Sequence, residues 1–526
     1  MLRRPSARLT RPTSRETFRD PDGVEIRPAQ RASITIALML ASVLQALDTT
    51  IANVALPHIR GSLSATSEQM GWVLTSYIVA AAIMTPLSGA LANRFGRKKL
   101  LAASVAGFTI TSALCGMSQS LFQIVLFRLL QGLCGASIMP LSQVVFLEIN
   151  PPHRQGRAAA LWGMGVLIGP IMGPLVGGWL TDNYSWRWVF FINVPLGLLA
   201  LVGILSSIHE SRTRRSPFDY LGFASLALGV GALQVMLDRG ELLDWFDSPE
   251  VCFEALIAGL SLYIFIIQTT TARHPFVSSA LFSDWNFLVG CVLMFIVSGV
   301  MLASLTLLPL LLQDLMNYPV TQAGIVMAPR GVGAFLTMAI MGRFIGRIDS
   351  RVLLGVGFGL VAWSVWQLSE LSPQMDDRVI VLSGFIQGTG TGLVWLVLAA
   401  VTFTTLAPAL RYEGTAFFNL ARNIGGSLGI AATQALLARN IQILHARLAE
   451  HIDAYVAHRH YGTLYDFASG HGLAVLNAVV TRQASFMAFN NDFRLLFWAT
   501  LGVMPLALLL RTWGDASRTR PATLVE

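Results

Sequence analysis

Apolar stretches of about 20 residues, the length that crosses a bilayer as a helix, recur along the whole sequence. Hydrophobic residues make up 54% of the 526 residues and charged residues only 13%, too few to cover the surface of a soluble protein. Lipid must therefore cover these stretches. Inside lipid the backbone satisfies its own hydrogen bonds, which favours helices, because the strands of a barrel would be shorter and alternate in polarity. The sequence predicts an all-α membrane protein.

The apolar stretches predict fourteen transmembrane helices. The first eight are expected at 33–56, 70–92, 100–119, 121–147, 158–181, 188–207, 218–237 and 251–270. The last six are expected at 287–311, 321–343, 351–370, 379–406, 414–439 and 493–511.

Basic residues fall in the N-terminal tail and in alternate connections between the predicted spans, which is typical of the cytoplasmic face of a membrane protein. Those in the connections are Arg94, Arg97, Lys98, Lys99, Arg154, Arg157, Arg212, Arg214, Arg215, Arg343, Arg347, Arg351 and Arg411. Both termini are therefore predicted to be cytoplasmic, which requires an even number of spans. This placement also argues against nucleic acid as the reason for the net charge of +8.

The chain contains an internal repeat. The segment 88–98 after the second span has a degenerate echo in 341–351 after the tenth, and Gln131-Gly132 in span four is echoed by Gln387-Gly388 in span twelve. Two six-helix halves with a two-helix insert explain this pattern, and such duplication marks secondary transporters with a substrate site between the halves. The expected parts are a cytoplasmic tail (1–32), the first half (33–207), the linker and insert (208–286), the second half (287–511) and a cytoplasmic C-terminal tail (512–526).

A long polar outer loop is expected at about 440–492, inside the second half. It contains five of the nine histidines, His445, His451, His458, His460 and His471. Their spacing matches no metal-ligand motif, so we expect no metal site and favour a solvated, partly helical extension of span thirteen.

Span five carries four glycines at intervals of four residues, interleaved with two prolines. The glycines are Gly165, Gly169, Gly173 and Gly177, and the prolines are Pro170 and Pro174. This spacing makes a ridge of small residues that lets another backbone approach closely, while each proline removes a helix hydrogen bond and favours a bend. Tight packing alone would also require such a ridge. A bent, closely packed helix also suits the hinge and seal of a rocking transporter.

One acidic residue, Asp48, lies inside the apolar region of span one, where a carboxylate is costly and usually functional. Arg128 is buried in span four, at a similar depth in the outer half of the membrane, so the two can pair. An arginine that approaches the carboxylate favours its charged form, and one that moves away favours proton uptake. The pair therefore predicts a proton switch coupled to conformation. The alternative for Asp48 is a packing role, bonded to nearby hydroxyls.

Further polar and aromatic residues inside the spans are candidates for the lining of a substrate cavity. They are Gln45, Asn53, Gln131, Gln143, Arg330, Trp395, Phe418, Asn419, Arg422 and Asn423. For any single polar residue an interhelical hydrogen bond is an alternative to a contact with a ligand. Three arginines stand against one buried acid in the spans, which predicts a preference for anions or weak acids over cations.

With these motifs the chain resembles the major facilitator superfamily, and within it the fourteen-helix drug:proton antiporters. Residues Leu47 to Pro57 match the first-span motif of those exporters, Arg128 with Gln131 and Gly132 matches the span-four motif linked to proton coupling, and Gly165 to Gly178 match the antiporter motif. The loop motif after span two implies a gating role for Gly89, Asn93, Arg94, Gly96, Arg97 and Lys98. Asn93 stands where an aspartate is usual, which weakens the expected charge relay.

The chain also resembles the EmrB-type pumps, on the stretches from Trp186 to Pro195 and from Met236 to Gly240. This resemblance implies a multidrug exporter in the bacterial inner membrane that is not an enzyme. It implies an EmrA-like periplasmic adaptor of the membrane-fusion type and a TolC-like outer-membrane channel as partners. It implies the proton as the coupling ion and no other cofactor, and no GxxxxGK[ST] nucleotide motif is found in the sequence. Proton-coupled uptake of a small nutrient is the alternative function.

Overall fold

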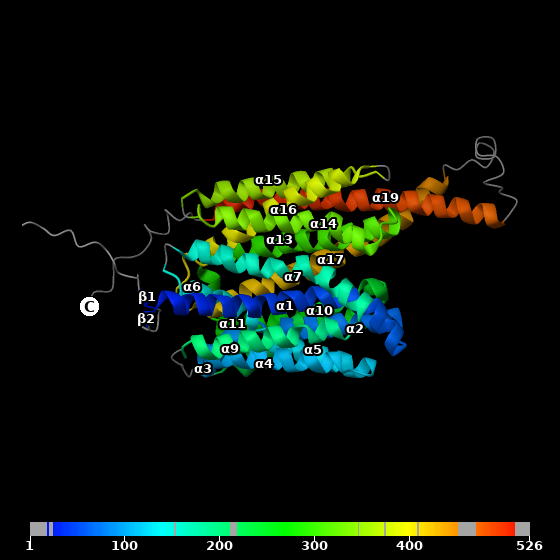
Figure 1. The fold of residues 1–526 in the computed structure, drawn as a ribbon. Helices are drawn as coiled ribbons and strands as arrows, with labels where there is room; N and C mark the ends of the chain where they lie inside the picture. Colours follow the sequence, from blue (N-terminus) through cyan, green and yellow to red (C-terminus); the bar gives the residue numbers. More distant parts are fainter. Residues whose placement is uncertain are drawn as a thin grey trace, which may run out of the picture.

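The structure, a computed structural model, describes residues 18–19, 25–151, 154–210, 218–345, 347–372, 375–407, 410–450 and 470–510. These residues form a bundle of helices (Figure 1). Two strands of two residues each, β1 (Phe18–Arg19) and β2 (Glu25–Ile26), pair antiparallel directly before the first helix.

The first part of the bundle runs from α1 to α9. Its helices are α1 (Pro28–Leu63), α2 (Ser67–Met84), α3 (Leu87–Phe95), α4 (Arg97–Gly116), α5 (Leu121–Gly135), α6 (Ile138–Glu148), α7 (Gln155–Asn183), α8 (Trp188–Phe191) and α9 (Asn193–Ser207). Polar caps fix several of the helix starts. At α2, for example, the Thr66 hydroxyl accepts a hydrogen bond from the backbone of Gln69, whose side chain accepts one from the backbone of Thr66.

The second part runs from α10 to the end of the described chain. Its helices are α10 (Tyr220–Arg239), α11 (Pro249–Thr271), α12 (Ser279–Ser283), α13 (Trp285–Leu310), α14 (Val320–Met341), α15 (Ser350–Ser369), α16 (Asp377–Val401), α17 (Arg411–Glu450) and α19 (Gly470–Val503). Short turns of other helix types complete it, η2 (Glu241–Leu243), η3 (Trp245–Asp247), η4 (Leu311–Leu315) and η7 (Met504–Leu509).

Twelve helical segments of the described chain are long and apolar enough to cross a membrane, and the bent pair α2–α3 makes thirteen if it counts as one span. The two parts of that pair meet at 56° beside Pro86, which cannot donate the hydrogen bond of a continuous helix. The predicted span on α17 is not in this count, because Asn419, Arg422 and Asn423 make it more polar. Helix α17 nevertheless packs lengthwise against α13 and α19, inside the bundle.

The helices divide into two groups, with α1–α9 on one side of the bundle and α13–α19 on the other (Figure 1). The described chain starts and finishes at the same end of the bundle (Figure 1). We call this the basic end, because the connections there carry Arg94, Arg97, Lys98, Arg154, Arg157, Arg343, Arg347 and Arg351.

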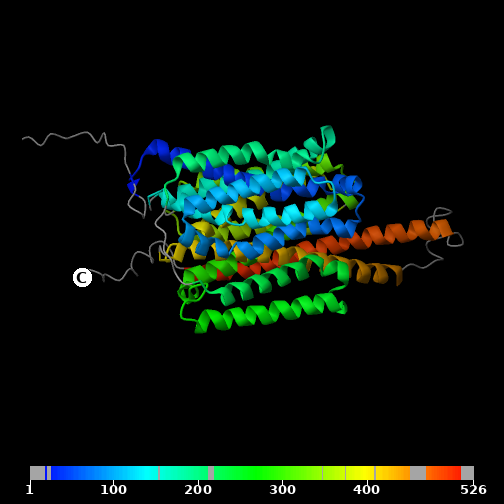
Figure 2. The ribbon, with the colours of Figure 1, turned by 90° about the horizontal axis from the view of Figure 1, so that it is seen from below.

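Helices α10 and α11 lie at one edge of the bundle, beside both groups (Figure 2). Helix α10 contacts α2 of the first group and α17 of the second. Asp238 near its end accepts a hydrogen bond from Thr75 on α2, and Gln234 donates one to Ser427 on α17 at 2.7 Å. The pair therefore contacts both groups from the outside.

The expected outer loop at 440–492 is helical at both ends; the extension of span thirteen agrees with the prediction, whereas the early start of the last helix was not predicted. Helix α17 continues to Glu450 and α19 begins at Gly470, 23 residues before the expected start of the last span. With 40 and 34 residues they extend about 60 and 51 Å, against about 30 Å for the hydrocarbon of a bilayer. Both project beyond the other helices at the end opposite the basic end (Figure 1). His445 and Asn477 join them through a side-chain hydrogen bond of 2.9 Å.

Three of the loop histidines, His451, His458 and His460, lie outside the described residues, as does the side chain of His471. Within the ranges that the structure describes, no three His, Cys, Asp or Glu side chains are grouped so that they could hold a metal ion.

Candidate functional site

A fully buried carboxylate lies at the centre of a cluster of four side chains from α1, α5 and α9. The Asp48 Oδ2 atom accepts a hydrogen bond from Nη1 of Arg128 at 2.6 Å. The other oxygen, Oδ1, accepts from Nε2 of Gln131 at 3.0 Å and from Nδ2 of Asn193 at 2.8 Å. We call these four residues the Asp48 cluster. The carboxylate thus accepts three hydrogen bonds and joins α1 to α5 and α9.

Arg128 is held in place by two residues of one further helix, α2. Its Nε donates to the backbone carbonyl of Val73 on α2 at 3.3 Å, and its guanidinium lies over the ring of Tyr77, 4.5 Å from the centroid. Within α5, Nη1 also donates to Gln131 Oε1 at 2.9 Å. Because both main contacts come from α2, a displacement of α2 relative to α1 would change the distance between the guanidinium and Asp48.

Asn193 is a member of the cluster that the sequence analysis does not single out. It stands at the first position of α9 and is fully buried, and its amide also donates to the Ser112 hydroxyl on α4 at 3.0 Å. Ser112 in turn donates to the carbonyl of Phe190 at 2.9 Å. In the sequence Asn193 is a single amide between apolar residues. That pattern does not show which neighbouring helix the side chain faces.

The glycine ridge of α7 packs on α1, the helix that carries Asp48. A Cβ atom added at Gly169 would lie 2.6 Å from the Cβ of Ala46, and one at Gly173 would lie 2.9 Å from the Cβ of Thr50. Gly165 faces Met39 and Gly177 faces Ile51 in the same way. The Thr50 hydroxyl donates to the carbonyl of Gly169 at 3.1 Å. The side chains of Pro170 and Pro174 lie outside the description, and Gly178 is half-buried beside the ridge.

At the basic end the two groups of helices are joined through the loop between α3 and α4. Arg97 forms an ion pair with Glu148 at the end of α6 and donates to the Tyr412 hydroxyl on α17 at 3.1 Å. The Tyr412 hydroxyl donates to Glu148 at 2.8 Å. Burial and the adjacent Glu148 carboxylate hold the pKa of Tyr412 well above its usual range, so the hydroxyl keeps its proton.

Two glycines near the connection between α3 and α4 have different structural roles. A Cβ atom at Gly89 would lie 3.2 Å from the backbone nitrogen of Glu413, so the glycine lets α3 approach α17. Gly96 has a φ of 89°, which a residue with a side chain rarely adopts, and it lets the chain turn from α3 into α4. Asn93 and Lys98 are half-buried and Arg94 is exposed. Of the predicted gating side chains, Arg97 is the one that bonds across the two groups.

We expect Tyr412→Phe to weaken the closure at the basic end. The substitution removes both hydrogen bonds of the hydroxyl, to Arg97 and to Glu148. Since both partners are charged, the loss should reach at least about 1.5 kcal/mol, so the open form should become at least about tenfold more populated. The measurement uses a variant without its own four cysteines and with a new cysteine at Ala160, which is buried in the closed form. The rate at which a maleimide labels this cysteine reports the population of the open form. Tyr220→Phe, at an exposed tyrosine, is the matched control. Equal labelling rates in the two variants would contradict the role of the Tyr412 hydroxyl.

Helices α7 and α14 extend the contact between the two groups from the basic end toward the middle. Gly342 packs against Ala160 and Gly163 against Met338, where added Cβ atoms would lie 2.5 Å and 2.9 Å from the facing side chains. The structure is therefore closed at the basic end.

Several predicted cavity residues lie between the two groups, on the basic side of the middle. The Asn419 amide donates to Gln143 Oε1 at 3.3 Å and so bonds α17 to α6. The Arg422 guanidinium lies over the Trp395 ring, 5.5 Å from its centroid, and donates to the adjacent Asn423. Trp395 packs against the cores of both groups. These side chains would separate if the basic end opened.

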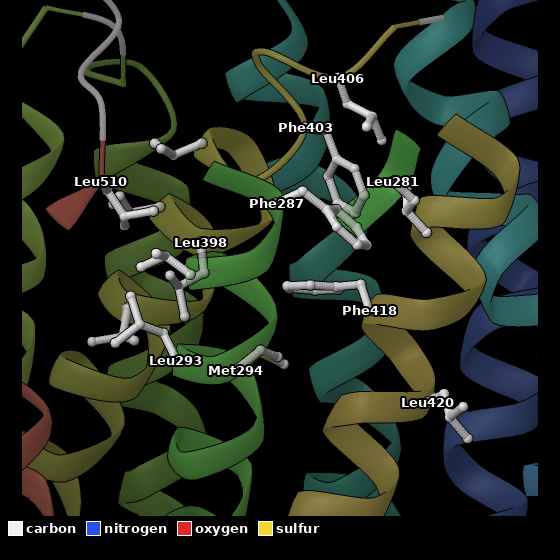
Figure 3. Packing of buried hydrophobic residues seen from close by; sticks show 14 of the residues in the cluster. Leu281, Phe287, Leu293, Met294, Leu398, Phe403, Leu406, Phe418, Leu420 and Leu510 are labelled. Atoms are coloured by element: carbon white, nitrogen blue, oxygen red, sulfur yellow. The ribbon is translucent and has the colours of Figure 1, made fainter. Parts of the chain in front are cut away.

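Other predicted cavity residues lie elsewhere. Gln45 is buried one turn before Asp48 on α1, and Asn53 is exposed. The predicted cavity residue Phe418 lies in a hydrophobic core in this conformation. It is only 4% exposed and packs against Phe403, with 5.4 Å between ring centroids, in a core that also contains Phe287 (Figure 3). In this conformation Phe418 is therefore part of the hydrophobic core that contains Phe287 and Phe403.

The balance of buried charges also differs from the prediction. Asp492 on α19 is 1% exposed, and Asn440 donates to its Oδ1 at 3.4 Å. The last predicted span begins one residue after Asp492, so the apolar pattern does not reveal this second acid. Arg128 is neutralised by Asp48, whereas Arg330 and Arg422 form no ion pair with the described acids. The buried Arg330 and the half-buried Arg422 therefore lack a paired carboxylate in the part of the chain that the structure describes.

The comparisons with known proteins agree with this architecture. The profile of the Major Facilitator Superfamily matches residues 38–430. The chain is similar to the fatty acid resistance protein FarB of Neisseria gonorrhoeae, at 36% identity over 474 residues, which are 89% of this chain and 94% of FarB. It is also similar to the multidrug export protein EmrB of Escherichia coli, at 36% identity over 496 residues, which are 92% of this chain and 95% of EmrB.

A solved structure supports the fold. The proton:xylose symporter XylE, bound to 6-bromo-6-deoxy-D-glucose, matches with a TM-score of 0.60 at 15% identity, and the match covers 92% of this chain and 99% of XylE. At this identity the likeness concerns the arrangement of the helices and carries nothing about the substrate.

Proposed function

Because this chain belongs to the major facilitator superfamily, we propose that it is a proton-driven antiporter that exports lipophilic drugs or toxic weak acids across the bacterial inner membrane. It is a membrane transporter of the EmrB-like drug efflux type and not an enzyme. Export fits the printed names of FarB and EmrB, which describe resistance and multidrug export.

The observation that carries the proposal is the Asp48 cluster. Asp48 would bind the transported proton, and Arg128 would release it by approaching the carboxylate. Since Arg128 is held by Val73 and Tyr77 of α2, a rocking motion that shifts α2 against α1 would couple proton binding to conformation. The ridge of α7 on α1 would serve as hinge and seal in that motion.

We further propose the arrangement that the sequence repeat predicts, fourteen spans in two six-helix halves with α10–α11 as the insert and both termini in the cytoplasm. The basic end would then face the cytoplasm, and the described conformation, closed there, would be the one open to the outside. The contacts of α10 with α2 and α17 support an insert that lies beside both halves (Figure 2).

We also propose that the chain is the pump of a tripartite system with an EmrA-like adaptor and a TolC-like channel. The projecting parts of α17 and α19 support this, because they extend beyond the bundle on the side where such an adaptor would lie. Proton-coupled uptake of a nutrient stays the alternative.

Transport into proteoliposomes tests the direction of coupling whichever way the protein inserts. An antiporter accumulates substrate in vesicles that are acidic inside, and a symporter accumulates it in vesicles that are acidic outside. The probes should be permanently charged, decanesulfonate and decyltrimethylammonium, because a weak acid distributes with the pH gradient by itself. We expect accumulation in acid-inside vesicles. Accumulation in acid-outside vesicles would favour uptake, and movement of neither probe would count against the proposal.

A further inference from the structure

Helix α10 lies beside both groups of helices (Figure 2), and one stripe of its residues faces the two. Gly231, Gln234 and Asp238 follow one another at intervals of three and four residues, which places them on one side of the helix. The Asp238 carboxylate accepts a hydrogen bond from the Thr75 hydroxyl on α2. Gln234 donates to the Ser427 hydroxyl on α17 at 2.7 Å. The same stripe therefore bonds to a helix of the first group and to a helix of the second.

The contact between α10 and α2 extends along one face of α2. The Arg239 guanidinium lies over the Trp72 ring, 5.0 Å from its centroid. A Cβ atom added at Gly231 would lie 3.0 Å from Cδ1 of Ile83. Trp72, Thr75 and Ile83 recur at spacings that place them on the same side of α2. Helix α10 is therefore packed along α2, and the Thr75 hydrogen bond fixes the register of the two helices.

The adjoining side of α2 holds Arg128. The Val73 carbonyl accepts from its Nε at 3.3 Å, and the Tyr77 ring lies 4.5 Å from its guanidinium. Thr75 lies between these two residues in the chain and is only 3% exposed. The backbone hydrogen bonds of a helix make one turn move as a unit. The bond from α10 therefore acts on the turn of α2 that holds the guanidinium beside Asp48.

Helix α17, the other partner of α10, is packed firmly within the second group. A Cβ atom added at Gly429 would lie 2.4 Å from the Cα of Gly299 on α13. Closely packed backbones transmit displacement because the protein interior is nearly incompressible. A movement of the second group therefore carries Ser427 with it. The bond from the buried Gln234 passes this movement on to α10.

We propose that Asp238 is a positioning residue for the Asp48–Arg128 pair, through which α10 makes the Arg128-holding turn of α2 follow the movement of α17. The inference rests on the proposed function and names the element that connects the second half to the charge pair. Without this connection, Arg128 would move away from Asp48 independently of the second half. Protons would then cross without substrate, and the proton gradient would drive less accumulation.

Substitutions of Thr75 in the full-length protein test this connection in transport. Thr75→Val removes the hydroxyl at nearly constant size, and Thr75→Ser keeps it. Thr270→Val on α11 is the matched control, because Thr270 is exposed and bonds only within its own helix, to the Ile266 carbonyl. Asp238→Ala tests the same bond from the exposed side of the pair and still decides if Thr75→Val does not fold.

Two quantities are compared in proteoliposomes with decanesulfonate and decyltrimethylammonium as probes. They are the accumulation in acid-inside vesicles and the rate of downhill uptake without a pH gradient. We expect Thr75→Val and Asp238→Ala to lower accumulation about fivefold or more and to change the downhill rate by less than about twofold, because coupling is lost and the transport path is not. Thr75→Ser and Thr270→Val should match the unchanged protein. Unchanged accumulation in Thr75→Val, or equal losses of both quantities, would overturn the proposal.

A measurement of stability tests the connection without transport. No hydrogen bond joins Thr75 to Arg128 in the described part of the chain, so any energetic coupling between them has to pass through α2. The fall in melting temperature caused by Thr75→Val is measured in the unchanged protein and in the double variant Asp48→Asn with Arg128→Gln. We expect the fall to be smaller by roughly a third or more in the double variant, because residues that act together are not additive. Equal falls in both backgrounds would contradict the proposal.

The two measurements separate this inference from the proposed function. If the unchanged protein accumulated neither probe, proton-driven export would be wrong, and the melting temperatures would still decide whether Thr75 is coupled to the charge pair. If the unchanged protein and Thr75→Val accumulated the probes equally, proton-driven export would stand and the positioning role of Asp238 would not.

Discussion

Asp48→Asn should abolish accumulation driven by a proton gradient while the protein still folds and inserts. The asparagine has no carboxylate to bind and release a proton, so substrate should move only down its own gradient. Its side chain keeps one oxygen acceptor for Arg128, but its NH2 group would face the donors of Gln131 or Asn193. Removal of one partner from a buried pair costs about 3–5 kcal/mol, so we expect a lower melting temperature as well.

The loss of coupling has to be separated from this loss of stability. The double variant Asp48→Asn with Arg128→Gln removes both charges and leaves no unpaired ion, so its stability should exceed that of the single variant. If the double variant is stable and still does not couple, the role of Asp48 is chemical. Accumulation against a gradient by either variant, measured in the same proteoliposomes, would show that the proton binds elsewhere, and Asp492 would be the next residue to test.

The positions of the membrane helices followed from the sequence because apolar stretches of bilayer length constrain a chain strongly. Each of the fourteen predicted spans overlaps a helix. The pairing of Asp48 with Arg128 was also within reach, since the direction of a span and the position of a residue in it give the residue's depth. Depth and charge together left few partners for a carboxylate in span one.

Features that depend on which face of a helix meets another helix were not predictable in this way. The contact of Asn193 with Asp48 depends on how α9 is rotated against α1, which hydropathy does not report. The packing of Phe418 in a core in this conformation depends on helix rotation in the same way. Asp492 was missed because α19 extends farther than its apolar stretch. Polar residues at the end of a span look like a loop when the helix continues beyond the membrane.

Gly169→Leu should destabilise the protein more than any single change to its surface. A side chain at this position would strike Ala46, because an added Cβ already lies 2.6 Å from the Ala46 Cβ. Helices α1 and α7 would have to separate, and overpacking of this kind costs about 1–3 kcal/mol or more. The separation would also move the turn of α1 that carries Asp48. We therefore expect a large fall in melting temperature in detergent and the loss of proton-driven transport.

Gly259→Leu on α11 provides the matched control, because it makes the same chemical change in a helix where an added Cβ meets nothing within 4 Å. Leucine favours a helix over glycine by roughly 1 kcal/mol, so this variant should be at least as stable as the unchanged protein. The contrast isolates the contact between α1 and α7 from the general effect of a larger side chain. A Gly169→Leu protein as stable and active as Gly259→Leu would mean that the ridge does not hold α7 against α1, the helix that carries Asp48.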